Sequence, residues 1–470
     1  MKMSISINKR FNREKFLWMV AACLVCFSAV KIIVYRSFLW ASVPALPFLV
    51  YLAVSRPFIF PFGAYVFLLP FDSLLSITGH TSGATLTKMM GILTMIALLL
   101  KGSFENRFVR PDKTVFCWTA LVLYAVSTFV WALDPERVKA MIPTALGLFA
   151  FYLIVSFYGA TEKDWSTLKS AILLGGFLAA IFSIYAYYAG DFFAVNSDRA
   201  TLMLGDRETN PNKLGFSMLM PTAICIELFF AQKRFNLKKI AYVLIFGILL
   251  FCVILTGSRE IMLGIGLIFM VFIYSSKRKF TVGLLLVFVS LPLVFFMQQF
   301  LIERWQGSVS SGGAGRVDIW WVGLKALGSY WITGVGLNNF PVAYTKFVDY
   351  GPGFHGFYRE AHNLYLNTSV EFGVAGIALL FWGLKRHYLL IRSSHGTDGQ
   401  GKMMLIALFW AISAASFFGT YFWDKAYWLF WMMVLIYDNL GKVHGHTEDA
   451  LHSTEKYRYF KSIRKGPVHL

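Results

Sequence analysis

The chain has 470 residues, of which 57% are hydrophobic and only 15% are charged. Soluble domains cannot bury that much apolar surface, so the composition predicts a polytopic membrane protein. The formal net charge of +19 would suit nucleic acid as a partner. However, the basic residues are spread over alternate loops between apolar segments, and this placement argues against nucleic-acid binding.

The apolar segments predict an all-α fold. A helix needs about 20 apolar residues to cross a bilayer. Segments that approach this length are 16–34, 37–54, 57–75, 84–101, 114–133, 141–159, 168–190, 212–231, 239–256, 259–275, 280–299, 363–387, 402–420 and 422–438. Prolines interrupt the second and third segments, so we expect about 12 to 14 transmembrane helices.

Lysine and arginine crowd into every second connection between these segments. The basic groups span Lys9 to Lys15, Lys101 to Lys113, Lys233 to Lys239, Lys277 to Lys279, Lys385 to Arg392 and Lys456 to Lys465. Cytoplasmic loops carry such an excess of positive charge, so the pattern predicts that both termini are cytoplasmic. We expect the polar, basic tail 441–470 to be disordered.

The predicted outward side contains one long connection, residues 301–362. Loops of this length inside a compact fold are usually functional. Within it, GRVDIWWVGLKALGSYW predicts a short amphipathic helix on the membrane surface, with Arg316 in its first turn. The apolar face of this helix is expected to contain Ile319, Trp320, Val322, Leu324, Leu327 and Trp331.

Arg259 stands between two apolar segments, in the sequence TGSREIMLG at 256–264. An ionisable group in this position is costly and rarely faces lipid. We therefore expect Arg259 to line a polar cavity. For Arg316, in contrast, anchoring to a phospholipid phosphate is an alternative that the sequence leaves open.

A histidine precedes the next apolar segment, in REAHNLYLNTSVEFGVAG. His362 can exchange a proton near neutral pH. Asn363 and Glu371 lie close to one helix face, two turns apart, and could orient that histidine. The alternatives are a hydrogen-bonded helix end for His362 and simple rim charges for Arg304, Arg359 and Glu371.

These residue types suit one reaction at a membrane surface. Arginine forks bind phosphate through two parallel hydrogen bonds, so several arginines favour a lipid diphosphate as the ligand. A histidine can act as the general base on a sugar hydroxyl while arginines stabilise the leaving diphosphate. The sequence contains no GxxxxGK[ST] motif that would indicate ATP.

Five short motifs together resemble the O-antigen ligase and polymerase superfamily, bacterial inner-membrane enzymes of the GT-C type. The motifs are TGSRE at 256–260, Asn-Pro-Asn at 210–212, GRVDIW at 315–320, GVGLNNF at 334–340 and AHNLYLNTSVEFGVAG at 361–376. The resemblance covers about residues 195–440. It suggests three divisions: N-terminal helices 1–194, a ligase-like region 195–440 that includes the loop 301–362, and the tail 441–470.

The resemblance implies roles for particular residues. Arg259 and Arg316 match the arginines of the family, and His362 matches its essential histidine. The implied reaction is inverting and needs neither metal nor cofactor, with undecaprenyl-diphosphate-linked glycan as the donor. Further substrate-binding residues are expected to be Arg304, Asn363, Arg359, Glu371 and Asn212. Glu260 departs from the family, because a small glycine usually follows the arginine, and an ion pair with Arg259 is one possible consequence.

The superfamily contains more than one activity. We expect an O-antigen ligase of the inner membrane with a periplasmic site, which transfers glycan to lipid A-core. The alternative is a polymerase of O-antigen or exopolysaccharide repeat units. A flippase or transporter of the lipid-linked glycan is a more remote alternative, since the internal repeats common in transporters are not detectable.

Overall fold

The structure is a computed structural model. It describes residues 46–75, 85–190, 199–204, 207–232, 234, 236–276, 279–310, 315–349, 356–394, 399–440 and 442. The predicted first span, 16–34, and nearly all of the tail 441–470 lie outside the described residues. The described residues are mainly helical. Besides an isolated antiparallel bridge between Phe108 and Tyr158, they contain one small antiparallel ribbon, in which Met203 pairs with Glu208 and Leu204 with Arg207.

The elements follow one another along the chain as a series of helices. In order they are α2 (Leu46–Ser55), α3 (Phe62–Leu68), η2 (Leu69–Phe71), α4 (Leu86–Glu105), α5 (Thr114–Ser127), η3 (Thr128–Val130), α6 (Pro135–Phe157), α7 (Glu162–Ala189), β1 (Met203–Leu204), β2 (Arg207–Glu208), α8 (Pro211–Ser217), α9 (Leu219–Ala231), α10 (Leu237–Thr256), α11 (Arg259–Ser275), α12 (Lys279–Phe296), α13 (Gln298–Ser310), α14 (Arg316–Tyr330), α15 (Phe340–Phe347), α16 (Leu364–Ser393) and α17 (Gly399–Ala415). A last helix covers residues 425–440.

Several of these helices can cross a membrane by length and composition. Among the described residues, 6 are long and apolar enough: α4, α6, α7, the α8–α9 pair, α10 and α16. Shorter apolar helices add to the hydrophobic part of the molecule. The predicted class, an all-α polytopic membrane protein, is therefore confirmed. The number of spans stays a prediction, because the first predicted span lies outside the described residues.

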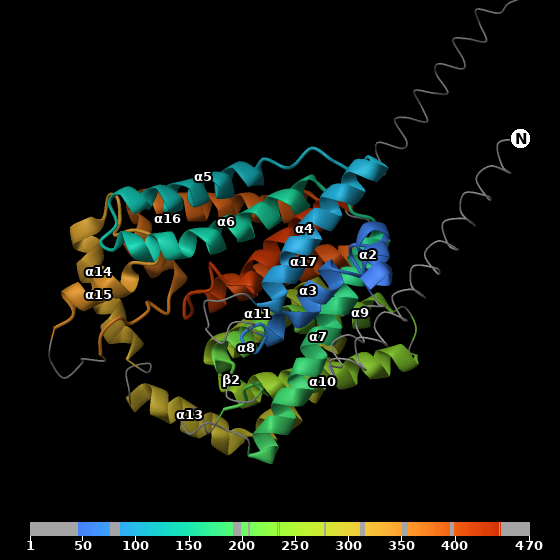
Figure 1. The fold of residues 1–470 in the computed structure, drawn as a ribbon. Helices are drawn as coiled ribbons and strands as arrows, with labels where there is room; N and C mark the ends of the chain where they lie inside the picture. Colours follow the sequence, from blue (N-terminus) through green and yellow to red (C-terminus); the bar gives the residue numbers. More distant parts are fainter. Residues whose placement is uncertain are drawn as a thin grey trace, which may run out of the picture.

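The helices α5, α6 and α16 lie side by side, and α14 and α15 lie across one end of them (Figure 1). We call this the α14 end of the molecule. Backbone hydrogen bonds join the two parts: the amide of Leu133 donates to the carbonyl of Val335 at 3.0 Å. The Asn339 side chain also accepts a hydrogen bond from the amide of Asp134 at 2.7 Å. These bonds fix the segment 315–349 against the bundle.

The α14 end has a hydrophobic core of its own. Ile319 and Val322 of α14 are 1% and 7% exposed and belong to a cluster that also contains Phe340 and Tyr344 of α15. The prediction that Ile319 and Val322 face the membrane surface is therefore wrong. The physical reason is that α15 supplies apolar partners for this face. The residues of α14 that do expose large apolar side chains are Val317, Trp321 and Leu324.

A kink in α16 joins two of the sequence motifs. Gly373 has a φ of 63° inside the helix, a conformation that glycine tolerates and side-chain-bearing residues rarely adopt. Next to it, the carbonyl of Glu371 accepts a hydrogen bond from the amide of Gly336 at 2.9 Å. The Glu371 carboxylate accepts another from the amide of Phe340 at 3.3 Å. GVGLNNF thus folds directly against the kinked helix.

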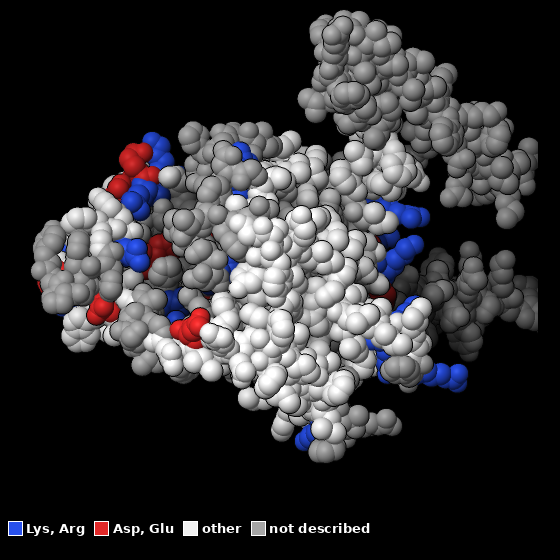
Figure 2. Space-filling view, turned by 90° about the horizontal axis from the view of Figure 1, so that it is seen from below, with Lys and Arg blue, Asp and Glu red and all other residues white. Residues whose placement is uncertain are grey.

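The charges divide between the two ends of the molecule. Figure 2 shows mainly lysine and arginine at the end away from α14, whereas acidic and basic side chains are mixed at the α14 end. Residues other than Lys, Arg, Asp and Glu form most of the surface between the two ends in this view. This division has the form that a membrane protein with one basic, cytoplasmic face would show.

Candidate functional site

The site begins at the turn between α10 and α11. Gly257 has a φ of 59° and ends α10 in the left-handed conformation, so the chain reverses within two residues and α11 starts at Arg259. This geometry puts Glu260 in the first helical turn, where its charge interacts favourably with the helix dipole. Arg259, the first residue of α11, is half-buried.

Glu260 connects three elements. Its Oε2 atom accepts a hydrogen bond from Nη1 of Arg316, the first residue of α14, at 3.0 Å. Its Oε1 atom accepts another from the hydroxyl of Tyr421 at 2.6 Å. The Tyr421 ring in turn stacks on Phe216 of α8, with the ring centres 4.0 Å apart. Arg316 and Glu260 are therefore brought together from positions 56 residues apart in the chain.

A second arginine lies against the same turn. Nε of Arg199 donates to the carbonyl of Thr256 at 2.6 Å, and its Nη2 donates to Oδ1 of Asn212 at 2.5 Å. Asn212 was predicted as a site residue, but Arg199 was not. The only indication of Arg199 in the sequence is its place 11 residues before the Asn-Pro-Asn motif.

One polar atom at this turn lacks a protein partner. The hydroxyl of Ser258 is buried, and no described residue forms a hydrogen bond with it. It precedes the first turn of α11, where backbone N–H groups and the helix dipole favour an anion. A buried hydroxyl without a partner is costly, so a ligand oxygen at this position would satisfy it.

His362 stands in the segment that leads into α16. Its φ of 46° lies in the left-handed region, and such conformations cluster at functional sites. Partial burial lowers the pKa of His362 below its usual value, and the positive charges of Arg316 and Arg359 lower it further while Glu360 opposes them. The imidazole is therefore neutral at pH 7, the form that can accept a proton.

The other predicted site residues occupy different environments. Asn363 caps α16, because its side chain accepts a hydrogen bond from the amide of Leu366 at 3.0 Å. Glu371 is 3% exposed and binds the backbone of GVGLNNF as described above. Arg359 is exposed next to His362. Arg304 belongs to α13, but its side chain is outside the described part of the structure. A role of these residues in substrate binding stays a prediction.

A second polar cluster surrounds Lys425, which begins the last helix four residues after Tyr421. Nζ of Lys425 donates to Oδ1 of Asp72 at 2.6 Å and to Oγ1 of Thr87 at 2.7 Å. It also donates to Oγ1 of Thr85 at 3.1 Å. The cluster ties the end of η2 and the start of α4 to the start of the last helix. These bonds hold Tyr421 in place with respect to the first half of the chain.

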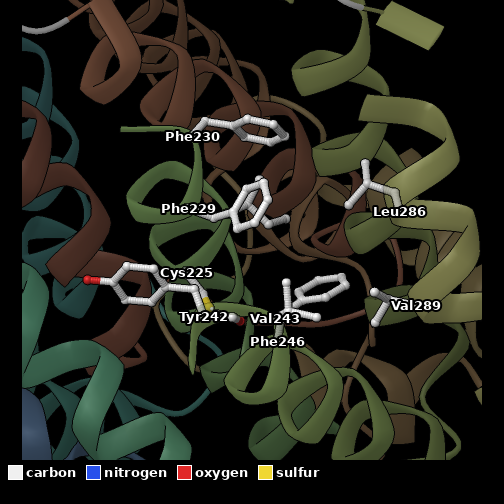
Figure 3. A pocket seen from close by; sticks show the side chains of 9 residues that line it. Cys225, Phe229, Phe230, Tyr242, Val243, Phe246, Leu286 and Val289 are labelled. Atoms are coloured by element: carbon white, nitrogen blue, oxygen red, sulfur yellow. Dashed lines mark hydrogen bonds between the residues drawn. The ribbon is translucent and has the colours of Figure 1, made fainter. Parts of the chain in front are cut away.

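The molecule also contains an apolar crevice between α9, α10 and α12, shown in Figure 3. Phe229, Tyr242 and Leu286 are among its lining residues, and none of the lining residues carries a charge. Such a lining does not suit a diphosphate, so the polar candidate site is the one at the α14 end. Within the described ranges, no group of three or more His, Cys, Asp or Glu residues could hold a metal ion.

The fold and the site together define a polytopic helical membrane protein with arginines and a histidine gathered at one end. Residues 244–381 match the family model described as O-antigen ligase. The matched segment contains TGSRE, GRVDIW, GVGLNNF and AHNLYLNTSVEFGVAG. Over this segment the chain is similar to the O-antigen ligase family, and the predicted superfamily is confirmed. A comparison with curated proteins found no match.

Proposed function

We propose that the protein transfers a glycan from an undecaprenyl-diphosphate carrier to an acceptor hydroxyl at the periplasmic face of the bacterial inner membrane. The observations that support the proposal are that Arg316 bonds to Glu260 and Arg199 bonds to the turn just before it, and that the charge of Arg316 acts on His362. The segment 244–381 also matches the O-antigen ligase family model. Transfer of glycan is the coarse activity of that superfamily. The donor, the acceptor and the face of the membrane belong to the proposal.

The arginines would bind the diphosphate. A guanidinium offers several N–H donors in a fixed planar fork that matches two phosphate oxygens. Arg199 and Arg316 each use part of this fork on protein partners, which orients the rest. We assign Arg259 to the same role, because it starts α11, where the helix N-terminus favours an anion.

His362 would act as the general base. In the transfer step the neutral imidazole takes the proton of the acceptor hydroxyl, and the acceptor oxygen forms a bond to the anomeric carbon. The bond from that carbon to the diphosphate oxygen breaks, and the diphosphate leaves with its electron pair. A single displacement inverts the configuration at the anomeric carbon. The positive charge of Arg316 would then have two effects. It would favour the neutral form of the His362 base and stabilise the leaving diphosphate.

We favour a ligase that uses lipid A-core as the acceptor, with a polymerase of repeat units as the alternative. The two are distinguished by deleting the gene and separating the lipopolysaccharide of the cells on a gel. A ligase predicts loss of the whole ladder and accumulation of carrier-linked polymer. A polymerase predicts a core that bears one repeat unit. An unchanged ladder and unchanged exopolysaccharide would reject both activities.

The proposal includes a reaction that needs no metal. Transfer by the purified protein in lipid nanodiscs, with its own lipid-linked donor, should proceed at the same rate with and without EDTA. If EDTA stopped the transfer and a divalent cation restored it, the arginine and histidine mechanism would be wrong.

A further inference from the structure

We propose that Glu260 and Tyr421 are positioning residues, which hold the guanidinium of Arg316 in the orientation that the leaving diphosphate requires. The inference rests on the function proposed above. It assigns a role to a carboxylate at a position where the O-antigen ligase superfamily, by the resemblance, usually has a glycine. It also includes a tyrosine that none of the sequence motifs contains.

The contacts leave the Glu260 carboxylate little freedom. Its side chain is 2% exposed, and each of its two oxygens has a partner, Arg316 at 3.0 Å and Tyr421 at 2.6 Å. The stacking of Tyr421 on Phe216 fixes the tyrosine in its turn. Because the partners come from different parts of the chain, the carboxylate can hold Arg316 only when all of these parts are packed together.

Arg316 needs such support because of where it stands. It is the first residue of α14, and the preceding Gly315 has a φ of 76° and provides no side-chain cap. The start of this helix is therefore held by the bond to Glu260. That bond is made by one terminal nitrogen, Nη1, and among the described residues no other hydrogen bond of the Arg316 side chain is seen. The other N–H groups of the fork have no hydrogen-bond partner among the described residues, and they are the groups that we assign to an anion.

Stability alone is a weak explanation of this pair. Removing two charges from water costs several kcal/mol per ion, and a buried ion pair often stabilises no better than an apolar pair of similar size. Arg316 is also 19% exposed, so its guanidinium reaches the surface of the site. Within the described ranges, both oxygens of the buried Glu260 carboxylate are hydrogen-bonded, whereas the Arg316 side chain makes one hydrogen bond. A catalytic group held by a buried, hydrogen-bonded neighbour shows this arrangement.

The decisive experiment is a double-mutant cycle of Glu260→Gln and Arg316→Ala, measured as glycan transfer by the purified protein in nanodiscs. Misplacement of a reacting group by about 1 Å can cost about 10²-fold in rate. We expect Glu260→Gln to lower kcat by about 10- to 100-fold with a smaller change in KM for the donor. The double variant should be no slower than Arg316→Ala alone, because Glu260 acts through Arg316.

Asp349→Asn is the matched control, because Asp349 forms an exposed ion pair with Lys325 of α14, the helix that Arg316 begins. The Asp349 and Lys325 side chains are 80% and 38% exposed. This variant should transfer at the wild-type rate. Two results would overturn the inference. One is a double variant whose loss of activity equals the product of the two single losses, and the other is full activity of Glu260→Gln.

A second readout needs no donor. Phenylglyoxal modifies arginine, and its rate at Arg316 can be followed by mass spectrometry of the peptides from the purified protein. Both Glu260→Gln and Tyr421→Phe should speed the modification of Arg316, while Asp349→Asn should not. Unchanged labelling in both variants would reject the positioning role even if the wild type transfers glycan. Faster labelling together with no transfer by the wild type would confirm the contact and reject the proposed function instead.

Discussion

At the scale of single residues, the surroundings of His362 influence its protonation. Burial and two arginines lower its pKa, and one neighbouring carboxylate raises it. If the neutral imidazole is the base, the transfer rate falls as the pH drops through this lowered pKa. The charged neighbours then become a means of moving the pH profile in a chosen direction.

The first prediction uses two exposed neighbours of opposite charge. Arg359→Gln removes a positive charge that disfavours the imidazolium, so the pKa of His362 rises and the acid limb of kcat/KM moves to higher pH. Glu360→Gln removes a negative charge that favours it, so the limb moves to lower pH. The measurement is the pH dependence of transfer by each variant. Shifts in the same direction would mean that His362 does not produce the limb.

The second prediction separates chemistry from binding. His362→Ala should lower the transfer rate on the order of 10²- to 10⁴-fold, the usual contribution of a general base. Binding of the undecaprenyl-diphosphate donor should change little, because the arginines provide that interaction. Rate and donor affinity are measured on the same purified protein. A variant that lost donor binding to the same extent as rate would place His362 in binding rather than in proton transfer.

The third prediction concerns the shape of an arginine. Arg259→Lys keeps the charge but replaces a planar fork by a point charge. We expect a loss of about 10²-fold or more in transfer, similar to the loss of one donor to a developing anion. The amount of the variant in the membrane should equal that of the wild type. Normal activity would restrict Arg259 to a general electrostatic role.

At the scale of elements, the kink in α16 determines where the α14 end sits. Gly373 lies against the backbone that follows α14: a Cβ atom at this position would be 2.3 Å from the carbonyl oxygen of Ile332. In addition, the amide of Val374 donates to the carbonyl of Trp331 at 2.8 Å. The close approach of the two chains and the positive φ therefore both require glycine here.

The fourth prediction compares two glycines within predicted spans. Gly373→Ala should destabilise the protein by about 1–3 kcal/mol or more, because the backbone conformation is unfavourable for alanine and the new Cβ has no space. Gly247→Ala is the control, since no atom lies within 4 Å of the added Cβ in the middle of α10. It should be neutral or stabilise by about 0.5–1 kcal/mol. Thermal unfolding in detergent measures both, and equal melting temperatures would contradict the proposed constraint.

At the scale of the whole molecule, the ends differ in charge. The end away from α14 shows mainly lysine and arginine (Figure 2), and the basic loops alternate along the sequence. The positive-inside rule therefore predicts that the α14 end faces the periplasm, in agreement with the proposed function. This orientation decides whether the site can meet a donor that is presented on the outer leaflet.

The fifth prediction tests that orientation. Alkaline phosphatase folds only outside the cytoplasm, so a fusion after Gly356 should be active and a fusion after Asn236, in the basic connection before α10, should be inactive. A cytoplasmic reporter at the same positions should give the opposite result. Two fusions on one side of the membrane would remove the basis for a periplasmic site.

The sequence by itself determined the class of the fold and the superfamily. Hydropathy is a sum of local transfer free energies, so an apolar segment such as 237–256 predicts its helix without knowledge of its neighbours. The motifs around Arg259, Arg316 and His362 are likewise local. Each of these three residues was predicted as a site residue from its own segment, and the match over residues 244–381 confirmed the superfamily.

Only the tertiary structure decided which of these groups meet. Glu260 pairs with Arg316 and Tyr421 across 56 and 161 residues, and Arg199 reaches the carbonyl of Thr256 across 57 residues. The sequence also did not predict which face of α14 is buried, because no sequence pattern indicated α15, the helix that packs against it. Such pairings depend on how helices pack, and packing is set by the shapes of surfaces from distant segments rather than by the composition of any one of them.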